Sequence, residues 1–219
     1  MNEVLFLAFF VILNLGILFA ARISKGLVFA GIAAFAILMN IFVLKPFEIF
    51  GFEIYGGNAL YGAIFLATDL LAENFSRRDA FLGVAAGFFG LAIYFCAAFF
   101  FVAIEPNFAV ENSLEIQNAL QTLFAPAWQI ALASVTAFLI SNSFDVFAFD
   151  FLKTKTRGRF LWLRNNLSTI VSQAFDTLIF TAIVSAFGIF EWKFFGEIIA
   201  FNLIFKIVLA FLDTPFLYF

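Results

Sequence analysis

The chain has 219 residues, of which 64% are hydrophobic and only 12% are charged, with a formal net charge of −3. Soluble domains are about half apolar and about a quarter charged, so this composition excludes a water-soluble globular protein and requires lipid as the solvent. The sequence has no histidine and a single cysteine, which excludes an internal disulfide and a thiolate metal cluster, and we expect no metal, no cofactor and no nucleic-acid partner.

Seven apolar runs are long enough to cross the hydrocarbon layer of a membrane, which takes about 20 residues. In chain order they cover residues 4–21, 27–44, 55–74, 80–104, 126–150, 167–190 and 195–218. The third run has glycines at 56, 57 and 62, so six spans plus a re-entrant or interfacial segment are the alternative. The polar stretch 105–125 is predicted to lie at the surface, with one short amphipathic helix. The sequence therefore predicts an all-α, polytopic membrane bundle that forms one domain over residues 1–219.

The basic residues of the loops alternate between the two ends of this predicted bundle. Nine of the twelve gather at one end: Arg22, Lys25, Arg77, Arg78, Lys153, Lys155, Arg157, Arg159 and Arg164. The positive-inside rule assigns this end to the cytoplasm, which predicts an external N-terminus and a cytoplasmic C-terminus. Glu3 stands where a signal peptide carries positive charge, so the first run is expected to remain as a helix.

Acidic residues, amides and a lysine lie within or at the ends of the apolar runs. A charge near the centre of a membrane helix costs about 3 kcal/mol on insertion scales, so such residues persist where they pair or contact a polar ligand. The candidate ligand-binding residues are Asp69, Glu73, Asn142, Asp145, Ser168, Gln173, Asp176, Asn202 and Lys206.

Local spacing suggests partners for some of these residues. Asp69 and Glu73 are four apart and share a helix face, although Glu73 can instead pair with Arg77 or Arg78 at the interface. Lys206 lies near the middle of the last run, too deep to reach water easily, and is expected to pair with one of the aspartates. At the start of the sixth run, residue 165 or 166, both asparagines, is expected to cap the helix.

A short pattern is repeated on the fifth and sixth runs. Asn142-Ser143-Phe144-Asp145 is followed by a phenylalanine at 149, and Gln173-Ala174-Phe175-Asp176 by a phenylalanine at 180. The two runs are antiparallel, so both aspartates lie roughly 12–18 Å from the basic loop that joins them. Asp69 is expected at a similar depth. We therefore expect the three acids to meet in one polar layer in the cytoplasmic half of the bundle.

Such a layer suits a planar polar ligand. A guanine-like edge offers N–H donors that a carboxylate accepts in pairs, and a carbonyl to which an amide or a lysine can donate. Aromatic rings beside the aspartates could stack on the base. The same groups also suit a cationic amine or a small vitamin.

The polar motifs resemble those of the queuosine precursor transporter family, multi-pass proteins also described as vitamin-uptake-like transporters. The resembling stretches are Thr68–Glu73, Asp145–Phe149, Leu161–Thr169, Ser172–Phe180, and Asn202–Lys206 together with Thr214-Pro215. The resemblance implies a non-enzymatic carrier in the cell inner membrane. It also implies import of the 7-deazaguanine bases preQ0 and preQ1 for queuosine synthesis in tRNA. Asn142 departs from the family pattern, which has glutamine there.

Other readings compete with this one. By size, the chain could be the substrate-capture subunit of an energy-coupling importer, with the ATPase as a separate partner. An intramembrane aspartyl protease is disfavoured because Asp145 lacks the YD and GxGD contexts, and a structural or chaperone role needs no ligand. Gly83, Gly87 and Gly90 on the fourth run would permit close helix contact, which allows a homodimer.

Overall fold

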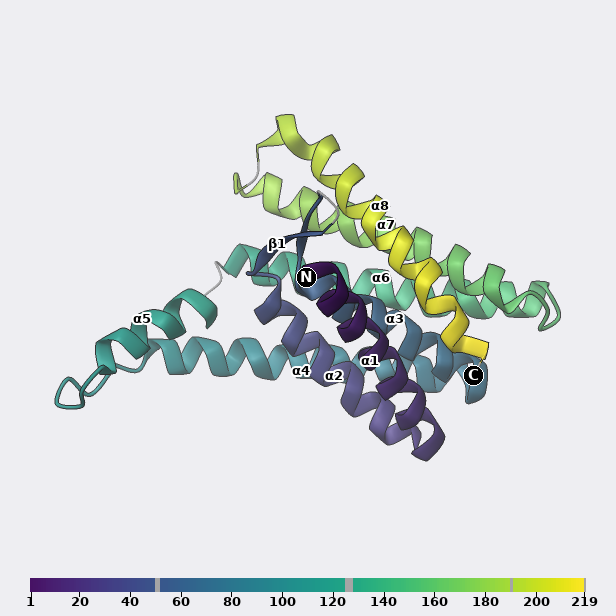
Figure 1. Ribbon diagram of the computed structural model, residues 1–219, viewed down its shortest axis with the longest axis horizontal. Coiled ribbons are helices and arrows are strands. Elements are labelled where there is room, and N and C mark those ends of the chain that lie inside the picture. The colour runs from purple at the N-terminus through teal and green to yellow at the C-terminus, as the bar shows by residue number, and fades with distance from the viewer. Residues whose placement is uncertain (50–51, 125–127, 190, 219) are drawn as a thin grey trace.

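The computed structural model describes residues 1–49, 52–124, 128–189 and 191–218. Figure 1 shows a helical bundle from which one short helix, α5, projects. The helices of the described residues are α1 (Asn2–Ile23), α2 (Lys25–Phe42), α3 (Gly57–Asn74), α4 (Arg77–Ala103), α5 (Ser113–Phe124), α6 (Trp128–Lys155), α7 (Leu161–Ala186) and α8 (Phe195–Asp213). Two 3-10 helices, η1 (Trp192–Phe194) and η2 (Thr214–Tyr218), flank α8.

Each of the seven predicted runs overlaps one of these helices, and the predicted amphipathic helix is α5. Five helices, α1, α2, α4, α6 and α7, are long and apolar enough to cross a membrane, as judged over the described residues. A polytopic helical membrane protein is thus confirmed, whereas seven spans and the orientation stay predictions.

A short β-hairpin departs from the all-α prediction. Strands β1 (Pro46–Ile49) and β2 (Phe52–Tyr55) are antiparallel, with Phe47 opposite Ile54. The glycine-rich segment that follows is helical from Gly57 onward. A Cβ atom on Gly57 would lie 2.7 Å from the carbonyl oxygen of Met39, so glycine is needed where α3 begins against the end of α2.

Helix α3 forms the centre of the bundle. It contacts α1, α2, α4, α6 and α8, and every residue from Ala59 to Ala72 is buried. The outer faces of the other helices are apolar and exposed, as at Phe89 and Phe99 on α4, which are 66% and 71% exposed. Polar side chains lie inside and large apolar side chains outside, which is the arrangement expected in lipid.

The glycines of α4 pack within the chain. A Cβ atom on Gly87 would lie 2.5 Å from the ring of Phe138 on α6, and one on Gly90 would lie 3.1 Å from the carbonyl oxygen of Ala33 on α2. Gly83 likewise lies against Leu71 of α3. These residues bring α4 close to its own neighbours, so the glycine face gives no support to a homodimer.

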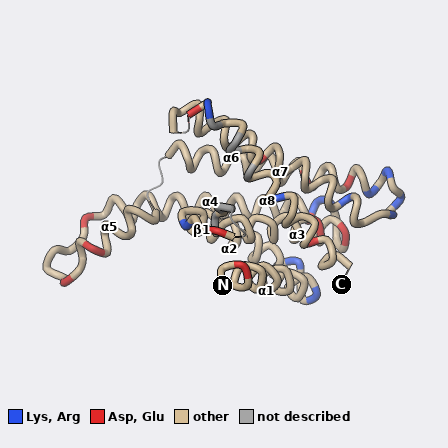
Figure 2. Tube along the Cα trace, turned by 45° about the horizontal axis from the view of Figure 1, so that its top comes forward, with Lys and Arg blue, Asp and Glu red and all other residues tan. Residues whose placement is uncertain are grey.

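The two ends of the bundle differ in charge. Lys and Arg gather at the α6–α7 loop and at the junction of α1 with α2, whereas α5 and its loop carry only acidic charges (Figure 2). At the basic end, Lys25 of α2 pairs with Asp79 of α4 at 2.7 Å. Two exposed tryptophans begin helices at the opposite end, Trp128 at α6 and Trp192 at η1, as aromatic residues do at a membrane interface.

Candidate functional site

Buried polar side chains follow one face of α7 and meet partners from α3, α6 and α8. They form three groups, taken here from the middle of α7 toward its basic end. The Asp176 group comprises Tyr61, Ser141, Asn142, Gln173, Asp176, Thr177 and Lys206. The carboxyl pair is Asp69 and Asp145. The Glu73 group comprises Glu73, Lys153 and Arg164.

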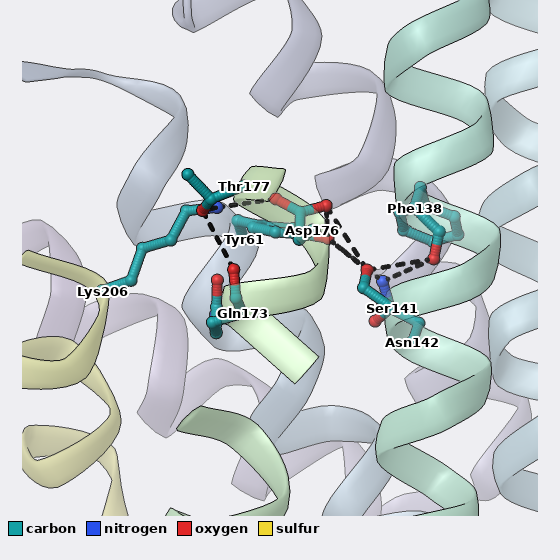
Figure 3. A network of polar contacts seen from close by, with 8 residues as sticks. All are labelled: Tyr61, Phe138, Ser141, Asn142, Gln173, Asp176, Thr177 and Lys206. Atoms are coloured by element: carbon teal, nitrogen blue, oxygen red, sulfur yellow. Dashed lines mark hydrogen bonds and ion pairs between the residues drawn. The ribbon is translucent and has the colours of Figure 1, made fainter. Parts of the chain in front are cut away.

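The Asp176 carboxylate joins four helices (Figure 3). Lys206 of α8 donates from Nζ to Oδ2 of Asp176 at 2.6 Å, and Tyr61 of α3 donates from its hydroxyl to Oδ1 at 2.5 Å. The hydroxyl of Ser141 on α6 lies 2.8 Å from that of Tyr61. Lys206 also contacts Thr177 Oγ1 at 3.1 Å, and its ammonium lies 5.0 Å from the centre of the Tyr61 ring. The lysine is thus held by an ion pair and a cation–π contact.

Two amide oxygens of this group have no donor among the described residues. They are Oδ1 of Asn142 and Oε1 of Gln173, and both side chains are buried. The amide nitrogen of Asn142 is engaged with the carbonyl oxygen of Phe138 at 3.0 Å. A buried acceptor without a donor costs about 1–3 kcal/mol, so these oxygens favour a ligand that brings N–H groups.

The carboxyl pair lies about one helical turn further along α6 and α7. Ser172 of α7 donates to Oδ1 of Asp145 at 3.0 Å, and Ser168 and Thr169 lie beside the same carboxyl group. Asp69 of α3 lies within hydrogen-bonding reach of Asp145, yet neither carboxylate can donate to the other. Both oxygens of Asp69 therefore lack a donor within the described part of the chain, in a side chain that is 0% exposed.

The Glu73 group lies at the basic end of the polar face. Arg164 of α7 and Lys153 of α6 each contact the Glu73 carboxylate at 3.1 Å. Lys153 also donates to the carbonyl oxygens of Ala72 and Glu73, at 3.0 Å each, which satisfies the end of α3. The predicted pairing of Glu73 with Arg77 or Arg78 is wrong because α6 and α7 cover the end of α3.

Arg77 and Arg164 both differ from their predicted positions. Arg77 lies on the first turn of α4, and its guanidinium contacts Asp150 of α6 at 3.5 Å. Arg164, counted as a loop charge in the sequence, is 0% exposed and stacks over the ring of Phe149 at 5.2 Å. Desolvating a guanidinium is expensive, so its partners on other helices must hold it there.

The asparagines at the start of the sixth run do not cap a helix. Helix α7 begins at Leu161, so Asn165 and Asn166 lie inside it. Their amide nitrogens donate to the end of α8, from Asn165 to Asp213 at 3.1 Å and from Asn166 to Thr214 at 2.7 Å. The capping prediction is wrong because these partners are nearly 50 residues away in sequence.

The repeated pattern on α6 and α7 is reciprocal in space. Ser141 of α6 reaches Asp176 of α7 at 3.4 Å, while Ser172 of α7 reaches Asp145 of α6 at 3.0 Å. The phenylalanine before each aspartate meets the other, with ring centroids 4.9 Å apart. The repeat is therefore one residue longer than the pattern found in the sequence, because a serine precedes each amide.

The structure divides the predicted site residues between these groups. Asn142, Gln173, Asp176 and Lys206 come together, and the pairing of Lys206 with an aspartate is confirmed. The other predicted residues lie elsewhere on the same face: Asp69, Asp145 and Ser168 at the carboxyl pair, Glu73 with Arg164, and Asn202 half-buried one turn before Lys206. The three acids thus occupy two adjacent layers rather than one.

Five members of the groups were not among the predicted site residues: Tyr61, Ser141, Lys153, Arg164 and Thr177. Tyr61 reads as an apolar packing residue, but it lies eight residues before Asp69, and that spacing on one helix face was the available signal. Arg164 carried no signal of burial, because its partner is on a distant helix.

Comparison with known proteins gave two matches that agree. The model of the family described as "putative vitamin uptake transporter" matches residues 55–219. The chain is also 33% identical over 216 residues to a protein of Bacillus subtilis (strain 168) named "probable queuosine precursor transporter", covering 97% of this chain and 92% of that protein. No solved structure matches the chain.

Proposed function

Because the chain belongs to the putative vitamin uptake transporter family, and is therefore a multi-pass membrane transporter, we propose that it imports the 7-deazaguanine bases preQ0 or preQ1. The imported base would supply queuosine synthesis in tRNA. The name of the Bacillus subtilis relative supports this substrate class, and the chemistry of the Asp176 group supports it independently.

The observation that carries the proposal is the set of buried acceptors around Asp176. The Asp176 carboxylate lies near two amide oxygens, those of Asn142 and Gln173, that have no donor among the described residues, and all three groups lie on the facing helices α6 and α7. The guanine-like edge of a 7-deazaguanine carries a ring N–H and an amino group, which are the donors that such acceptors lack. A ligand rich in acceptors would leave these oxygens unsatisfied and would bind poorly.

Binding requires the ion pair between Lys206 and Asp176 to open. The N–H edge of the base takes the place of Lys206 on the carboxylate, and the ammonium turns to the carbonyl group of the base. The ring of Tyr61, which Lys206 covers at 5.0 Å, is then free to stack on the base. The ion pair thus keeps the empty site neutral and compact until a base of matching polarity replaces it.

The difference in charge between the two ends of the bundle supports an orientation that suits import. Most of the basic residues lie at the α6–α7 end, which the positive-inside rule assigns to the cytoplasm. The Asp176 group lies beyond the carboxyl pair from that end. A base that enters from outside therefore meets the Asp176 group before the Glu73 group.

Two measurements on the purified protein test the proposal. A thermal-shift screen against preQ0, preQ1, queuine, guanine and common vitamins should show stabilisation by the deazaguanines that grows with the logarithm of concentration. Proteoliposomes should exchange labelled preQ0 or preQ1, and Asp176→Ala should abolish this exchange while the protein still inserts. Exchange at the normal rate in that variant, or stabilisation by an unrelated vitamin alone, would overturn the proposal.

A further inference from the structure

The carboxyl pair is not needed to recognise a base, and its charges are not balanced. In the Asp176 group one carboxylate meets one ammonium at 2.6 Å. In the Glu73 group one carboxylate meets two cations at 3.1 Å. The carboxyl pair places two acids next to each other, both 0% exposed. Among the described residues only hydroxyl groups donate to Asp145, and no group donates to Asp69.

The reciprocal repeat shows which charge is missing at the carboxyl pair. Each half of the repeat presents a serine to the aspartate of the other half, Ser141 to Asp176 and Ser172 to Asp145. In the first case Lys206 supplies the neutralising positive charge. In the second case the equivalent neighbour is another acid, Asp69, and neither of its oxygens has a donor in the residues that the structure describes. A bound cation or proton must therefore take the part that Lys206 takes at Asp176.

We propose that Asp69 and Asp145 hold one proton between them, and that this proton crosses the membrane together with the base. The inference rests on the transport function proposed above and adds its driving force. The proton comes from water on the outer side and forms an O–H bond on one carboxyl group, which donates to the other. It leaves to the cytoplasmic water, and no redox partner is involved.

The surrounding charges give the proton a route of release. The charged groups that act on Asp69 are Asp145 of α6, Arg164 of α7 and Asp213 at the end of α8. The charged residues of α1, α2 and α4, which also pack on α3, lie only in their terminal turns. Arg164 lies on the cytoplasmic side of the pair, and its Nε and Nη1 have no hydrogen-bond partner over the described ranges. If Arg164 turns from Glu73 toward Asp69, the carboxylate gains a cation and the proton is displaced inward.

The carboxyl pair and the base share their helices, which couples them. Asp145 follows Asn142 by three residues on α6, and Ser172 precedes Asp176 by four on α7, so about 5–6 Å of helix separates the two sites. A shift of α6 against α7 that admits the base therefore also changes the spacing of the pair. Binding of the base and of the proton become linked equilibria.

The test uses the purified full chain in proteoliposomes and labelled preQ0, which is neutral and so is not trapped by a pH gradient itself. With acid outside and the membrane potential clamped at zero, the wild type should accumulate preQ0, by up to about tenfold per pH unit for one proton per base. Addition of preQ0 should also acidify the interior, followed with an enclosed pH dye. Exchange of preQ0 at equal pH is measured in the same preparation.

The outcomes separate the two proposals. No exchange by the wild type would refute the transport function itself. Exchange without accumulation under the pH gradient, or accumulation driven by a sodium gradient instead, would overturn proton coupling and leave the transport function standing. In Asp69→Asn and Asp145→Asn we expect accumulation to fall to the equilibrium level, a loss of up to about tenfold per pH unit, and the dye signal to be lost. Asp150→Asn should behave as the wild type, because Asp150 lies on the same helix as Asp145 but pairs with Arg77 near the basic end.

Discussion

At the scale of single residues, the buried charge of Asp176 requires both a partner of opposite charge and a functional explanation. Its ion pair with Lys206 is almost fully desolvated, with side-chain exposures of 12% and 10%. Such pairs often contribute little net stability, because desolvation offsets the attraction between the charges. A pair of similar-sized apolar residues would stabilise the bundle equally well, so the presence of the charges is best explained by the ligand that we propose they bind.

At the Asp176–Lys206 pair we expect substitutions to affect stability and transport independently. Asp176→Asn should destabilise the protein by about 3–5 kcal/mol, because it leaves the Lys206 ammonium buried without its counter-ion. The double variant Asp176→Leu with Lys206→Met should recover most of that loss and still fail to transport. Thermal unfolding in detergent and uptake in proteoliposomes measure the two effects. Recovery of uptake in the double variant would show that the pair is structural only.

For the amide oxygens we expect the opposite effect of a substitution on stability. Gln173→Met keeps the length of the side chain and removes a buried acceptor that has no donor among the described residues. We expect an unchanged or higher melting temperature, because an unsatisfied group is lost, and an affinity for preQ0 about tenfold lower, because one hydrogen bond to the base is lost. Thermal unfolding measures the melting temperature, and calorimetric titration measures the affinity for preQ0. A clear fall in melting temperature would show that the oxygen has an internal partner.

Residue-level chemistry was only partly predictable from the sequence. The presence of a polar site, and the pairing of Lys206 with an acid, follow from the cost of burying charge in an apolar helix. The choice of Asp176 rather than Asp69 or Asp145 depends on how α8 lies against α7, which no spacing along one helix encodes. The burial of Arg164 depends in the same way on Glu73, which is 91 residues away.

At the scale of elements, the helices were the most predictable part because each has to span an apolar layer. The largest error is the start of α7, at Leu161 rather than residue 167, since Arg164 and two asparagines look like loop residues until α3 and α8 supply their partners. The hairpin was missed although Phe-Glu-Ile occurs on both sides of Gly51, a pattern typical of paired strands.

The close packing of α2 and α4 leads to a prediction on stability. Gly90→Leu should strongly reduce the yield of folded protein, because its Cβ atom would already meet the backbone of Ala33 at 3.1–3.3 Å and that backbone belongs to a helix. Gly16→Leu on α1 is the matched control, because nothing lies within 4 Å of the added Cβ atom. Monodisperse protein recovered by size exclusion is the measurement. Equal recovery of the two variants would contradict the packing of α4 on α2.

At the scale of the whole molecule, the distribution of side chains is that of a protein solvated by lipid at its sides and by water at its ends. Polar groups of α3, α6, α7 and α8 lie inside, phenylalanines cover the outside, and the basic residues mark one end (Figure 2). This arrangement, and the family, were predictable from the sequence. The orientation rests on the charge asymmetry alone and so calls for a direct test.

The unique Cys96 makes that test simple, because Cys96→Ser gives a background without thiols. In this background, Glu111→Cys lies in the exposed loop before α5. Arg159→Cys lies in the exposed loop between α6 and α7, where Arg157 remains and Lys153 and Lys155 occupy the last turn of α6. If the basic end is cytoplasmic, a membrane-impermeant maleimide should label Glu111→Cys in intact cells and label Arg159→Cys only after the cells are opened. The reverse pattern would place the N-terminus in the cytoplasm. The base would then reach the Glu73 group before the Asp176 group, which would contradict the order of contacts that we propose for import.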